Sequence, residues 1–265
     1  MDKITKQFSG SWAIILGGSS GFGFATVEKL ARHGMNIAVL YREIATADKT
    51  VKQSFSEIAT GNGVTILPFN INALDAGARK TFIADFVSDK KHKVKLLLHS
   101  IARGNLKPLA ADDGTSLTVD DIQLTTYAMA TSILDWARDL QAADAFCNDA
   151  RVIGLTSEGS HKYWEGYAAV SVAKASLESL NTYMAVELAK FGLKTNLIQA
   201  GVTATPSLKR IPDSERLLEG AVQRNPFKRL TKPEDVANVI YLLCTPEAAW
   251  INGAVIHVDG GEHCC

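Results

Sequence analysis

Short apolar runs alternate with longer amphipathic segments along the chain. The first run, residues 12–17, is typical of a strand buried on both faces of a parallel sheet. A helix pattern follows at once, with Val27, Leu30 and Ala31 at spacings of three and four residues and Gly34 as a stop signal. The same alternation predicts further strands at 36–41, 64–69, 94–99, 151–156, 194–199 and 254–258, and helices near 45–59, 74–88, 119–146, 167–191 and 233–244.

This rhythm predicts a Rossmann-type, doubly wound α/β fold with seven parallel strands and right-handed crossovers. The 265 residues suit a single domain, and no repeat or composition break divides them. Two long irregular stretches, 103–118 and 202–231, follow the carboxyl ends of strands, where open α/β sheets bind ligands. The second contains Pro206, Pro212 and Pro226, and we expect it to form a mobile lid over a substrate.

Composition argues against several classes of protein. Basic and acidic side chains each number 28, so the formal net charge is +0 and no global field attracts nucleic acid or an anionic membrane. We find neither a secretion signal nor an apolar stretch long enough to span a bilayer, and we expect a cytoplasmic protein. The four cysteines, Cys147, Cys244, Cys264 and Cys265, show no metal-ligand spacing, so we expect idle thiols and no bound metal.

A glycine-rich loop joins the first predicted strand to the first helix. Gly17, Gly21 and Gly23 have the spacing Gly-x3-Gly-x-Gly. Glycines permit a positive φ and a close approach of the backbone to a pyrophosphate, which lies against the N–H groups of a helix start. The strand before the loop and the helix after it favour a dinucleotide site over a simple tight turn. The other loop residues that we expect to contact the cofactor are Ser19, Ser20 and Phe22.

The glycine spacing resembles the fingerprint of the short-chain dehydrogenase/reductase family, with Leu16 in place of the usual threonine. Asn70-Ile71 resembles the family's adenine-binding Asp-Val, residues 200–202 resemble its Pro-Gly turn, and residues 258–261 resemble its C-terminal signature. These similarities cover nearly the whole chain and imply a nicotinamide cofactor, NADPH or NADH. Besides the glycine loop, the expected cofactor contacts are Tyr41, Arg42, Asn70, Ile71, Ser100, Ile101, Ala102, Lys174, Gly201, Val202, Thr203 and Thr205. Turn capping is the alternative for the two threonines.

The choice between the two cofactors depends on the end of the second strand. A carboxylate there accepts the ribose hydroxyls of NADH, whereas a basic side chain binds the 2′-phosphate of NADPH. Tyr41 and Arg42 occupy this place, which favours NADPH. Glu43 follows directly, and Ser20 stands where many NADPH-dependent members carry a basic residue, so both argue the other way. The alternative for Arg42 is a solvated surface charge.

The catalytic pattern departs from that of most members of the family, which reduce ketones with a Tyr-x3-Lys pair. Val170 stands four residues before Lys174, whereas Tyr167 stands seven before it, and two helical turns return a side chain to nearly the same face. Tyr-x6-Lys resembles the enoyl-acyl-carrier-protein reductases, as do residues 99–102, His-Ser-Ile-Ala. Ser157, seventeen residues before Lys174, instead matches the serine of the ketone reducers.

The longer Tyr-x6-Lys spacing suits a substrate in which negative charge develops on an oxygen farther from the carbon that accepts the hydride. In a ketone the hydride lands on the carbon that bears the oxygen, whereas in an enoyl thioester it lands on Cβ and charge develops on a carbonyl oxygen two carbons away. A phenol set back along the helix by about 4.5 Å would meet that oxygen. The resemblance then implies that Tyr167 donates to the enolate and that Lys174 holds the nicotinamide ribose, with Ser157 as a third catalytic candidate.

The sequence thus predicts an NADPH-dependent reductase of the 2,3 double bond of an enoyl thioester, as in fatty-acid biosynthesis. A ketone or alcohol oxidoreductase of the same fold, and a cofactor-binding regulator without turnover, are the alternatives. Basic residues of segment 202–231 would suit an acyl carrier protein that delivers the thioester, and the alternative is a solvated lid. The charged residues are Lys209, Arg210, Arg216, Arg224, Lys228 and Arg229, with Asp213, Glu215 and Glu219. The long helices near 119–146 and 167–191 resemble those of family dimers and tetramers, so we expect a homotetramer or a homodimer.

Overall fold

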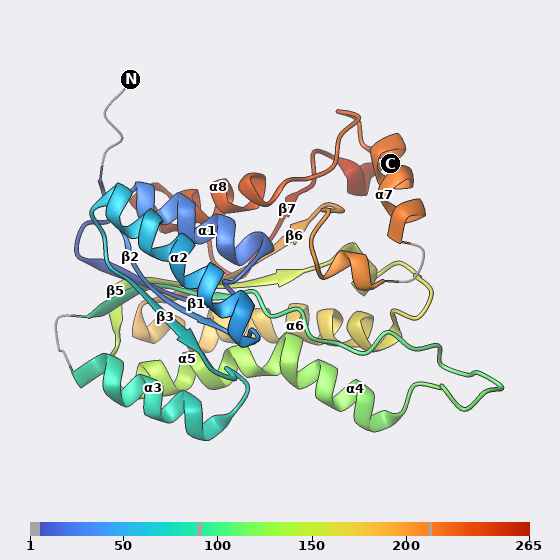
Figure 1. The fold of residues 1–265 in the computed structure, drawn as a ribbon, viewed down its shortest axis with the longest axis horizontal. Helices are drawn as coiled ribbons and strands as arrows, with labels where there is room; N and C mark the ends of the chain where they lie inside the picture. The colour runs from blue at the N-terminus through green and yellow to red at the C-terminus, as the bar shows by residue number, and fades with distance from the viewer. Residues whose placement is uncertain (1–5, 89–91, 212–213) are drawn as a thin grey trace.

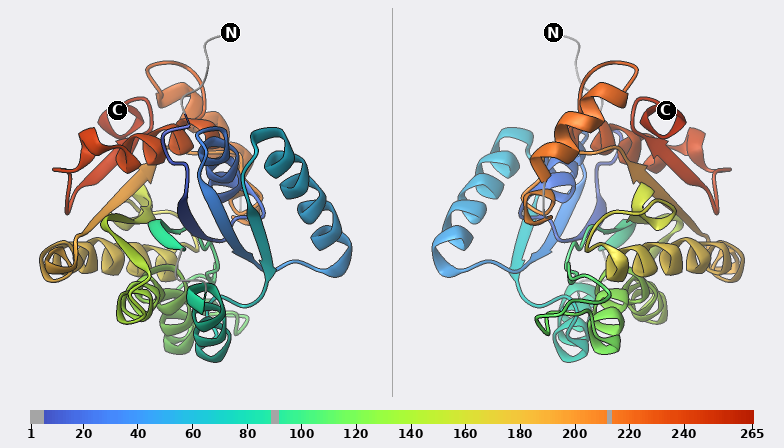
Figure 2. Two further views of the ribbon diagram at one scale, coloured as in Figure 1. Left: turned by 90° about the vertical axis from the view of Figure 1, so that its left-hand side faces the viewer. Right: turned by 90° about the vertical axis from the view of Figure 1, so that its right-hand side faces the viewer.

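The computed structural model describes residues 6–88, 92–211 and 214–265, and the side chain of Arg210 is also outside the description. Within these residues, seven parallel strands form one sheet in the order β3-β2-β1-β4-β5-β6-β7. Helices cover both faces of the sheet (Figure 1), and the end-on views show the sheet between the two helical layers (Figure 2). The predicted doubly wound fold with seven parallel strands is confirmed.

The strands are β1 (Ser11–Leu16), β2 (Asn36–Tyr41), β3 (Ile66–Asn70), β4 (Lys93–His99), β5 (Phe146–Thr156), β6 (Leu193–Ala200) and β7 (Val255–Val258). The helices are α1 (Gly21–Arg32), α2 (Ala45–Asn62), α3 (Ala76–Ser88), α4 (Val119–Thr126), α5 (Ser132–Ala142), α6 (Ala168–Glu187), α7 (Ser214–Arg224) and α8 (Pro233–Cys244). A π-helical turn, Tyr127–Thr131, joins α4 to α5.

Alternation along the strands divides the apolar side chains between two cores. In β1, Trp12, Ile14 and Leu16 pack with side chains of α3, α5 and α6, whereas Ala13 and Ile15 pack with those of α1, α2 and α8. Side chains of a strand point alternately to opposite faces, so a strand between two helical layers is apolar throughout. This burial on both faces explains the continuous apolar runs of the sequence.

Two predicted segments differ from the structure. The helix expected at 119–146 ends at Ala142, and β5 begins at Phe146, because Asp144 turns the chain with a φ of 50° and Val94 of β4 pairs with Phe146. Apolar residues at 146–147 fit either a helix or a strand, so the pattern alone could not separate the two elements.

The second difference concerns segment 202–231, which was expected to be irregular. It contains helix α7 and a short 3₁₀ turn, Leu208–Arg210. Gly220 inside the helix and the prolines on both sides of it obscured the helical pattern. Pro212 and Asp213 of this segment lie outside the described residues. Among the residues described, no helix is both long and apolar enough to cross a membrane.

Candidate active site

A cleft of about 890 Å³ opens at the carboxyl ends of the strands. Residues that follow β1, β2, β4, β5 and β6 line it, so it spans the point between β1 and β4 where the strand order reverses. Open α/β sheets bind ligands at this kind of switch point. Three catalytic candidates, Tyr167, Lys174 and Ser157, line the same cleft as the glycine loop.

The glycine loop packs too tightly for side chains. Gly17 has a φ of +84°, and a Cβ on it would lie 2.4 Å from the carbonyl oxygen of Ser100. A Cβ on Gly23 would lie 2.2 Å from the carbonyl oxygen of Gly17. Ser20 at the start of α1 makes no side-chain capping bond, and the first turn of α1 has no acidic residue. The helix start therefore presents backbone N–H groups to the cleft, as binding of a pyrophosphate requires.

Three neighbouring residues at the end of β2 have side chains in different surroundings. Tyr41 is buried, and its hydroxyl donates a hydrogen bond to Asp48 of α2 at 2.7 Å, so its side chain is directed toward α2. Arg42 is exposed and lines the cleft. The Glu43 carboxylate accepts a hydrogen bond from Ser19 Oγ in the glycine loop at 2.8 Å. Arg42 is thus the basic side chain that the end of β2 presents to the cleft.

Asn70, the expected adenine contact, is not among the residues that line the cleft. Its side chain accepts a hydrogen bond from the backbone N–H of Glu43 at 3.0 Å and donates one to the carbonyl of Glu43 at 2.9 Å. Asn70 therefore holds the loop after β2, whereas its neighbour Ile71 lines the cleft. The parallel pairing of β2 and β3 brings Asn70 to this position, because it places Asn70 beside Tyr41.

Lys174 is buried on α6, with 6% of its surface exposed. Its Nζ donates a hydrogen bond to the carbonyl oxygen of Leu155 at 2.7 Å, which ties α6 to the end of β5. Burial lowers the pKa of Lys174 to about 8, although the charge of Glu178 raises it in part. The lysine therefore carries its proton at neutral pH but loses it more readily than a surface lysine.

Tyr167 is the N-cap residue of α6, and its hydroxyl donates a hydrogen bond to Ser157 Oγ at 3.3 Å. Burial raises the pKa of Tyr167, so the phenol keeps its proton and can donate it to an oxygen in the cleft. Ser157 Oγ also accepts the backbone N–H of Gly159 at 3.1 Å. Val170, four residues before Lys174, supplies only apolar surface to the cleft.

An apolar compartment adjoins the tyrosine. Tyr167 packs in one buried cluster with Met129 and Val170, and the Trp164 ring lies 5.0 Å from the Tyr167 ring, centroid to centroid. Partly buried apolar side chains around this cluster are Leu74, Leu106, Trp164 and Ile211. The compartment can hold a hydrocarbon group beside the only described tyrosine hydroxyl that lines the cleft near Lys174.

Comparison with known proteins agrees with this geometry. The family model described as Enoyl-(Acyl carrier protein) reductase matches residues 17–263. The chain belongs to the short-chain dehydrogenase/reductase family. As a member of this family, it is an oxidoreductase that uses a nicotinamide cofactor.

Several short-chain dehydrogenase/reductase relatives match over most of their length. A 1-cyclohexenylcarbonyl-CoA reductase of Streptomyces collinus is 28% identical, over 94% of this chain and 85% of the relative. An enoyl-(acyl-carrier-protein) reductase (NADH) of Aquifex aeolicus is 26% identical, over 96% and 92%. A tropinone reductase homologue of Arabidopsis thaliana is 27% identical, over 98% and 94%. A short-chain dehydrogenase/reductase structure from Serratia marcescens superposes with a TM-score of 0.80 at 24% identity, over 96% of this chain and 98% of that one, which supports the fold.

The structure brings most of the residues expected from the family resemblance into the cleft. Those that line it are Gly17, Ser19, Ser20, Gly21, Phe22, Tyr41, Arg42, Ile71, Ser100, Ile101, Ala102, Lys174, Gly201, Val202, Thr203 and Thr205. Gly23 does not line it, because it packs beneath Gly17. Thr203 Oγ1 donates to the carbonyl of Gly201 at 2.9 Å, and Thr205 Oγ1 accepts the N–H of Leu208 at 3.2 Å, so both hydroxyls also cap local turns.

Sequence reasoning missed Glu178, which organises the loop that carries Ser157. Its carboxylate accepts hydrogen bonds from Thr156 Oγ1 at 2.5 Å and from Ser160 Oγ at 2.9 Å, and it pairs with His161 at 2.8 Å. The available signal was its position four residues after Lys174, on the same face of α6. His99 was part of the quoted motif, but it is buried, pairs with Ser132 at 2.8 Å and does not line the cleft.

Proposed function

We propose that this short-chain dehydrogenase/reductase is an NADPH-dependent enoyl-thioester reductase. The observation that carries the proposal is the position of Tyr167, seven residues before Lys174, in the cleft and beside an apolar compartment. Val170 occupies the position where a Tyr-x3-Lys pair would have its phenol, and it cannot donate a proton. The glycine loop would hold the cofactor and Arg42 would bind its 2′-phosphate, and the chemistry that the bound cofactor would supply is a hydride for the β-carbon of the substrate.

Residues of the chain stabilise the negative charge that develops when the hydride is added. As the β-carbon gains hydride, the electron pair of the double bond moves toward the thioester and gives an enolate oxygen. The Tyr167 hydroxyl donates to that oxygen, and the Lys174 ammonium favours the negative charge. The proton that Tyr167 gives to the enolate oxygen then moves to the α-carbon as the enol tautomerises, which completes the saturated thioester, and solvent reprotonates Tyr167 after the product leaves. The apolar compartment of Met129, Val170 and Trp164 holds the acyl group and excludes water from the enolate.

Two relatives support this substrate class by their names. The Streptomyces collinus relative is named for 1-cyclohexenylcarbonyl-CoA, a thioester whose double bond is conjugated with the carbonyl group. The Aquifex aeolicus relative is named for an enoyl group on acyl carrier protein. We extend the substrate class, but not the carrier, to this chain.

Ketone reduction is the second candidate, and one contact favours it. Ser157 Oγ lies 3.3 Å from Tyr167 Oη, so two hydroxyl groups converge on one point where a ketone oxygen would accept from both. The tropinone reductase homologue among the relatives agrees with this alternative. In an enoyl thioester the enolate oxygen lies two carbons from the carbon that accepts the hydride, and it needs only one hydrogen-bond donor, Tyr167.

The test is NADPH oxidation with crotonyl-CoA and acetoacetyl-CoA side by side, followed by crotonyl on acyl carrier protein. We expect crotonyl-CoA to be reduced and Tyr167→Phe to lower its kcat about 10²–10³-fold, as for the loss of one oxyanion donor. Tyr163→Phe is the matched control, because Tyr163 is 88% exposed and does not line the cleft.

Ser157→Ala separates the two candidates. An enoyl reductase that uses Tyr167 retains most of its activity in this variant, whereas a ketone reductase loses it. Turnover of acetoacetyl-CoA alone, with strong dependence on Ser157, would reject the enoyl proposal in favour of the ketone reductase. No turnover of either substrate, with cofactor binding intact, would favour a regulator.

A further inference from the structure

A buried acidic residue near the end of the chain borders the cleft. Glu262 belongs to the 3₁₀ turn Glu262–Cys264, which follows β7, and 2% of its surface is exposed. It lines the cleft together with residues of the loop 201–205 after β6, which includes four of the expected cofactor contacts. Acidic side chains are rarely this buried unless they are paired, so the partners of Glu262 indicate what the residue does.

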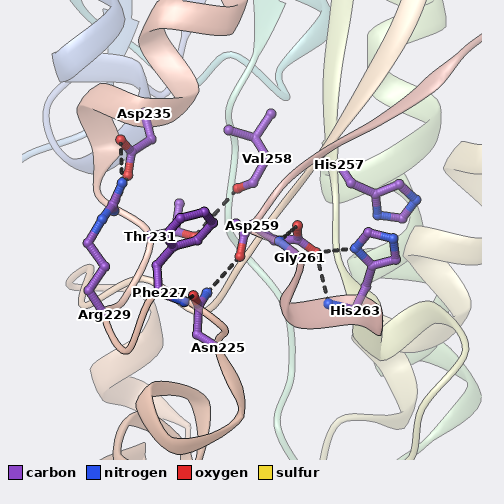
Figure 3. Close-up of a pocket in the computed structure, with 11 residues that line it drawn as sticks. Asn225, Phe227, Arg229, Thr231, Asp235, His257, Val258, Asp259, Gly261 and His263 are labelled. Carbon is purple, nitrogen blue, oxygen red and sulfur yellow. Dashed lines mark hydrogen bonds and ion pairs between the residues drawn. The ribbon is translucent and has the colours of Figure 1, made fainter. Parts of the chain in front are cut away.

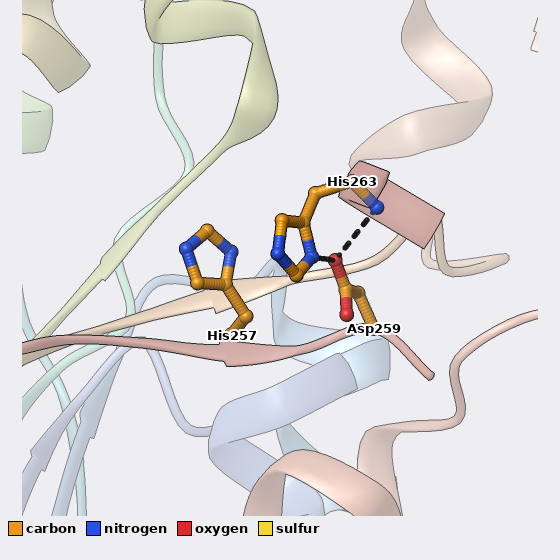
Figure 4. Close-up of side chains that lie close together, drawn as sticks. All are labelled: His257, Asp259 and His263. Atoms are coloured by element: carbon orange, nitrogen blue, oxygen red, sulfur yellow. Dashed lines mark hydrogen bonds and ion pairs between the residues drawn. The ribbon is translucent and has the colours of Figure 1, made fainter. Parts of the chain in front are cut away.

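Asp259 closes the turn that carries Glu262. Its Oδ1 accepts the N–H of Gly261 at 2.9 Å, and its Oδ2 accepts the backbone N–H of His263 at 3.0 Å (Figure 3). The His263 ring meets the same carboxylate, with Nδ1 2.6 Å from Oδ2, and Figure 4 shows this ring between Asp259 and His257. The main chain on both sides of Glu262 is therefore held in place, which sets the direction of its side chain.

The end of helix α7 holds the same turn. Asn225, which follows the helix, donates from Nδ2 to the carbonyl of Asp259 at 2.7 Å. Arg224, the last residue of the helix, donates to Glu262 Oε1 at 2.8 Å. Its guanidinium also lies 3.7 Å from a carboxylate oxygen of Glu158. Arg224 thus pairs with two acidic residues that line the cleft.

The other carboxylate oxygen of Glu262 holds the loop after β6. Oε2 accepts the backbone N–H of Val202 at 3.2 Å, and the preceding N–H, of Gly201, donates to the carbonyl of Val258 at 3.1 Å. A Cβ on Gly201 would lie 2.9 Å from Glu262 Oε2, so the loop packs directly against the carboxylate. Two consecutive N–H groups at the start of loop 201–205 therefore bind to the end of the chain.

The surroundings of Glu262 require a carboxylate. Burial raises the pKa of Glu262, whereas the N–H of Val202 and the charge of Arg224 lower it in part. Both partners are hydrogen-bond donors, and a carboxylate offers an acceptor oxygen to each of them. An amide side chain has one oxygen and could satisfy one partner, and a hydrocarbon side chain could satisfy neither.

We propose that Glu262 is a positioning residue for the nicotinamide cofactor. Its Oε2 holds the N–H of Val202 and so keeps loop 201–205 in the conformation that lines the cleft, while Arg224 compensates its charge. A loop that is already ordered loses less conformational entropy when a ligand binds, so the cofactor binds more tightly. The inference goes beyond the proposed function, because it concerns the cofactor and not the substrate.

The test is the Kd of NADPH, measured by fluorescence titration of the full chain without substrate, and with NADH if the wild-type protein prefers it. Glu262→Leu should weaken the Kd about 10-fold or more, because it leaves the N–H of Val202 unpaired. Glu262→Gln keeps one acceptor for that N–H and should keep the Kd within about 3-fold of the wild-type value. Glu247→Leu is the matched control, because Glu247 is an exposed acid in another 3₁₀ turn, Pro246–Ala248, and does not line the cleft.

Hydrogen exchange of the cofactor-free protein gives a second measurement. Amides of loop 201–205 should exchange faster in Glu262→Leu than in the wild-type protein or in Glu247→Leu, whereas those of β1 should be unchanged. If Glu262→Leu does not fold, as thermal unfolding would show, Glu262→Asp replaces it with the same expectation, because its shorter side chain withdraws the carboxylate from Val202.

Three results would overturn the proposal. They are an unchanged Kd in Glu262→Leu or its replacement Glu262→Asp, an equal effect of Glu247→Leu, and a loss in Glu262→Gln as large as that in the other Glu262 variants. Turnover of crotonyl-CoA does not enter this test, so its outcome is separate from that of the enoyl-thioester proposal.

Discussion

Lys174 has a buried side chain at the edge of the cleft. The contacts that hold it there are the carbonyl of Leu155 and the more distant charge of Glu178. Since burial disfavours the charged form, the pKa of Lys174 falls to about 8, and the residue changes its charge close to physiological pH. Tyr167 changes in the opposite sense, because burial of a phenol raises its pKa.

We therefore expect kcat/KM for the enoyl thioester to fall as pH rises through about 8. Below that pH Lys174 is positive and stabilises the enolate, whereas above it the amine is neutral. Tyr167 remains a proton donor throughout this range. The measurement is kcat/KM from about pH 6 to about pH 10, which reports groups of the free enzyme. Glu178→Gln removes a charge that raises the pKa of Lys174, so the decline should begin at lower pH; a shift to higher pH would contradict this account.

Arg42 is the residue that we expect to decide between the two cofactors. It lines the cleft at the end of β2, whereas Glu43 is occupied by Ser19. Arg42→Ala should lower kcat/KM for NADPH about 10- to 100-fold, which corresponds to a lost charge-assisted hydrogen bond, and should leave NADH little affected. Lys49→Ala, an exposed cation on α2, is the control. Equal or better use of NADH by the wild-type enzyme would reject the assignment of NADPH.

At the scale of the element, helix α7 is connected by ion pairs to the loop that carries Ser157 and to the C-terminal turn. Arg224, its last residue, pairs with Glu262 of the C-terminal turn at 2.8 Å and approaches Glu158, next to Ser157, at 3.7 Å. Ala221 is its only buried residue, so little apolar surface holds the helix in place. An element held mainly by ion pairs opens at low free-energy cost, as lids do.

We expect hydrogen exchange of the α7 amides to slow when NADPH and a substrate analogue bind. Arg224→Met removes both ion pairs but keeps an unbranched side chain, so exchange in the free protein should become faster and the slowing on binding should diminish. Arg216→Met, at an exposed position of the same helix, is the matched control. Amides of α7 that are already as protected as those of β1 in the free protein would show that α7 is not a lid.

At the scale of the whole molecule, α4 and α6 leave an apolar surface uncovered in the single chain. Val172, Tyr183 and Val186 follow one another on one face of α6, and Leu124 is exposed on the neighbouring helix α4. Tyr183 is 64% and Val186 is 74% exposed. Several exposed apolar side chains on neighbouring helices are typical of association sites.

We therefore expect a homodimer or homotetramer that uses this face. Light scattering after size exclusion should give a mass that is a multiple of 28.6 kDa. The double variant Tyr183→Glu, Val186→Glu should shift the mass toward that of one chain, because charges on an interface are costly to bury. Lys49→Glu, on the opposite helical layer, should leave the mass unchanged. If the wild-type protein is a monomer, this surface is not an interface between copies of the chain.

The parts of the site that lie within one turn or one helix could be predicted from the sequence. Gly17, Gly21 and Gly23 determine the glycine loop because their spacing alone sets which backbone positions can approach a phosphate. Tyr167 and Lys174 share a face of α6 because helical periodicity brings residues seven apart back together. The apolar runs likewise predicted the seven strands, because the strands at the centre of the sheet, such as β1 and β2, are buried on both faces and are mainly apolar.

Tertiary structure alone decided the contacts between distant segments. Asn70 reaches Glu43, Ser157 meets Tyr167, and Glu178 holds the loop that carries Ser157, because parallel pairing and helix packing bring together residues with no common spacing. Local periodicity acts within a few residues of the chain, whereas these juxtapositions depend on how separate elements pack.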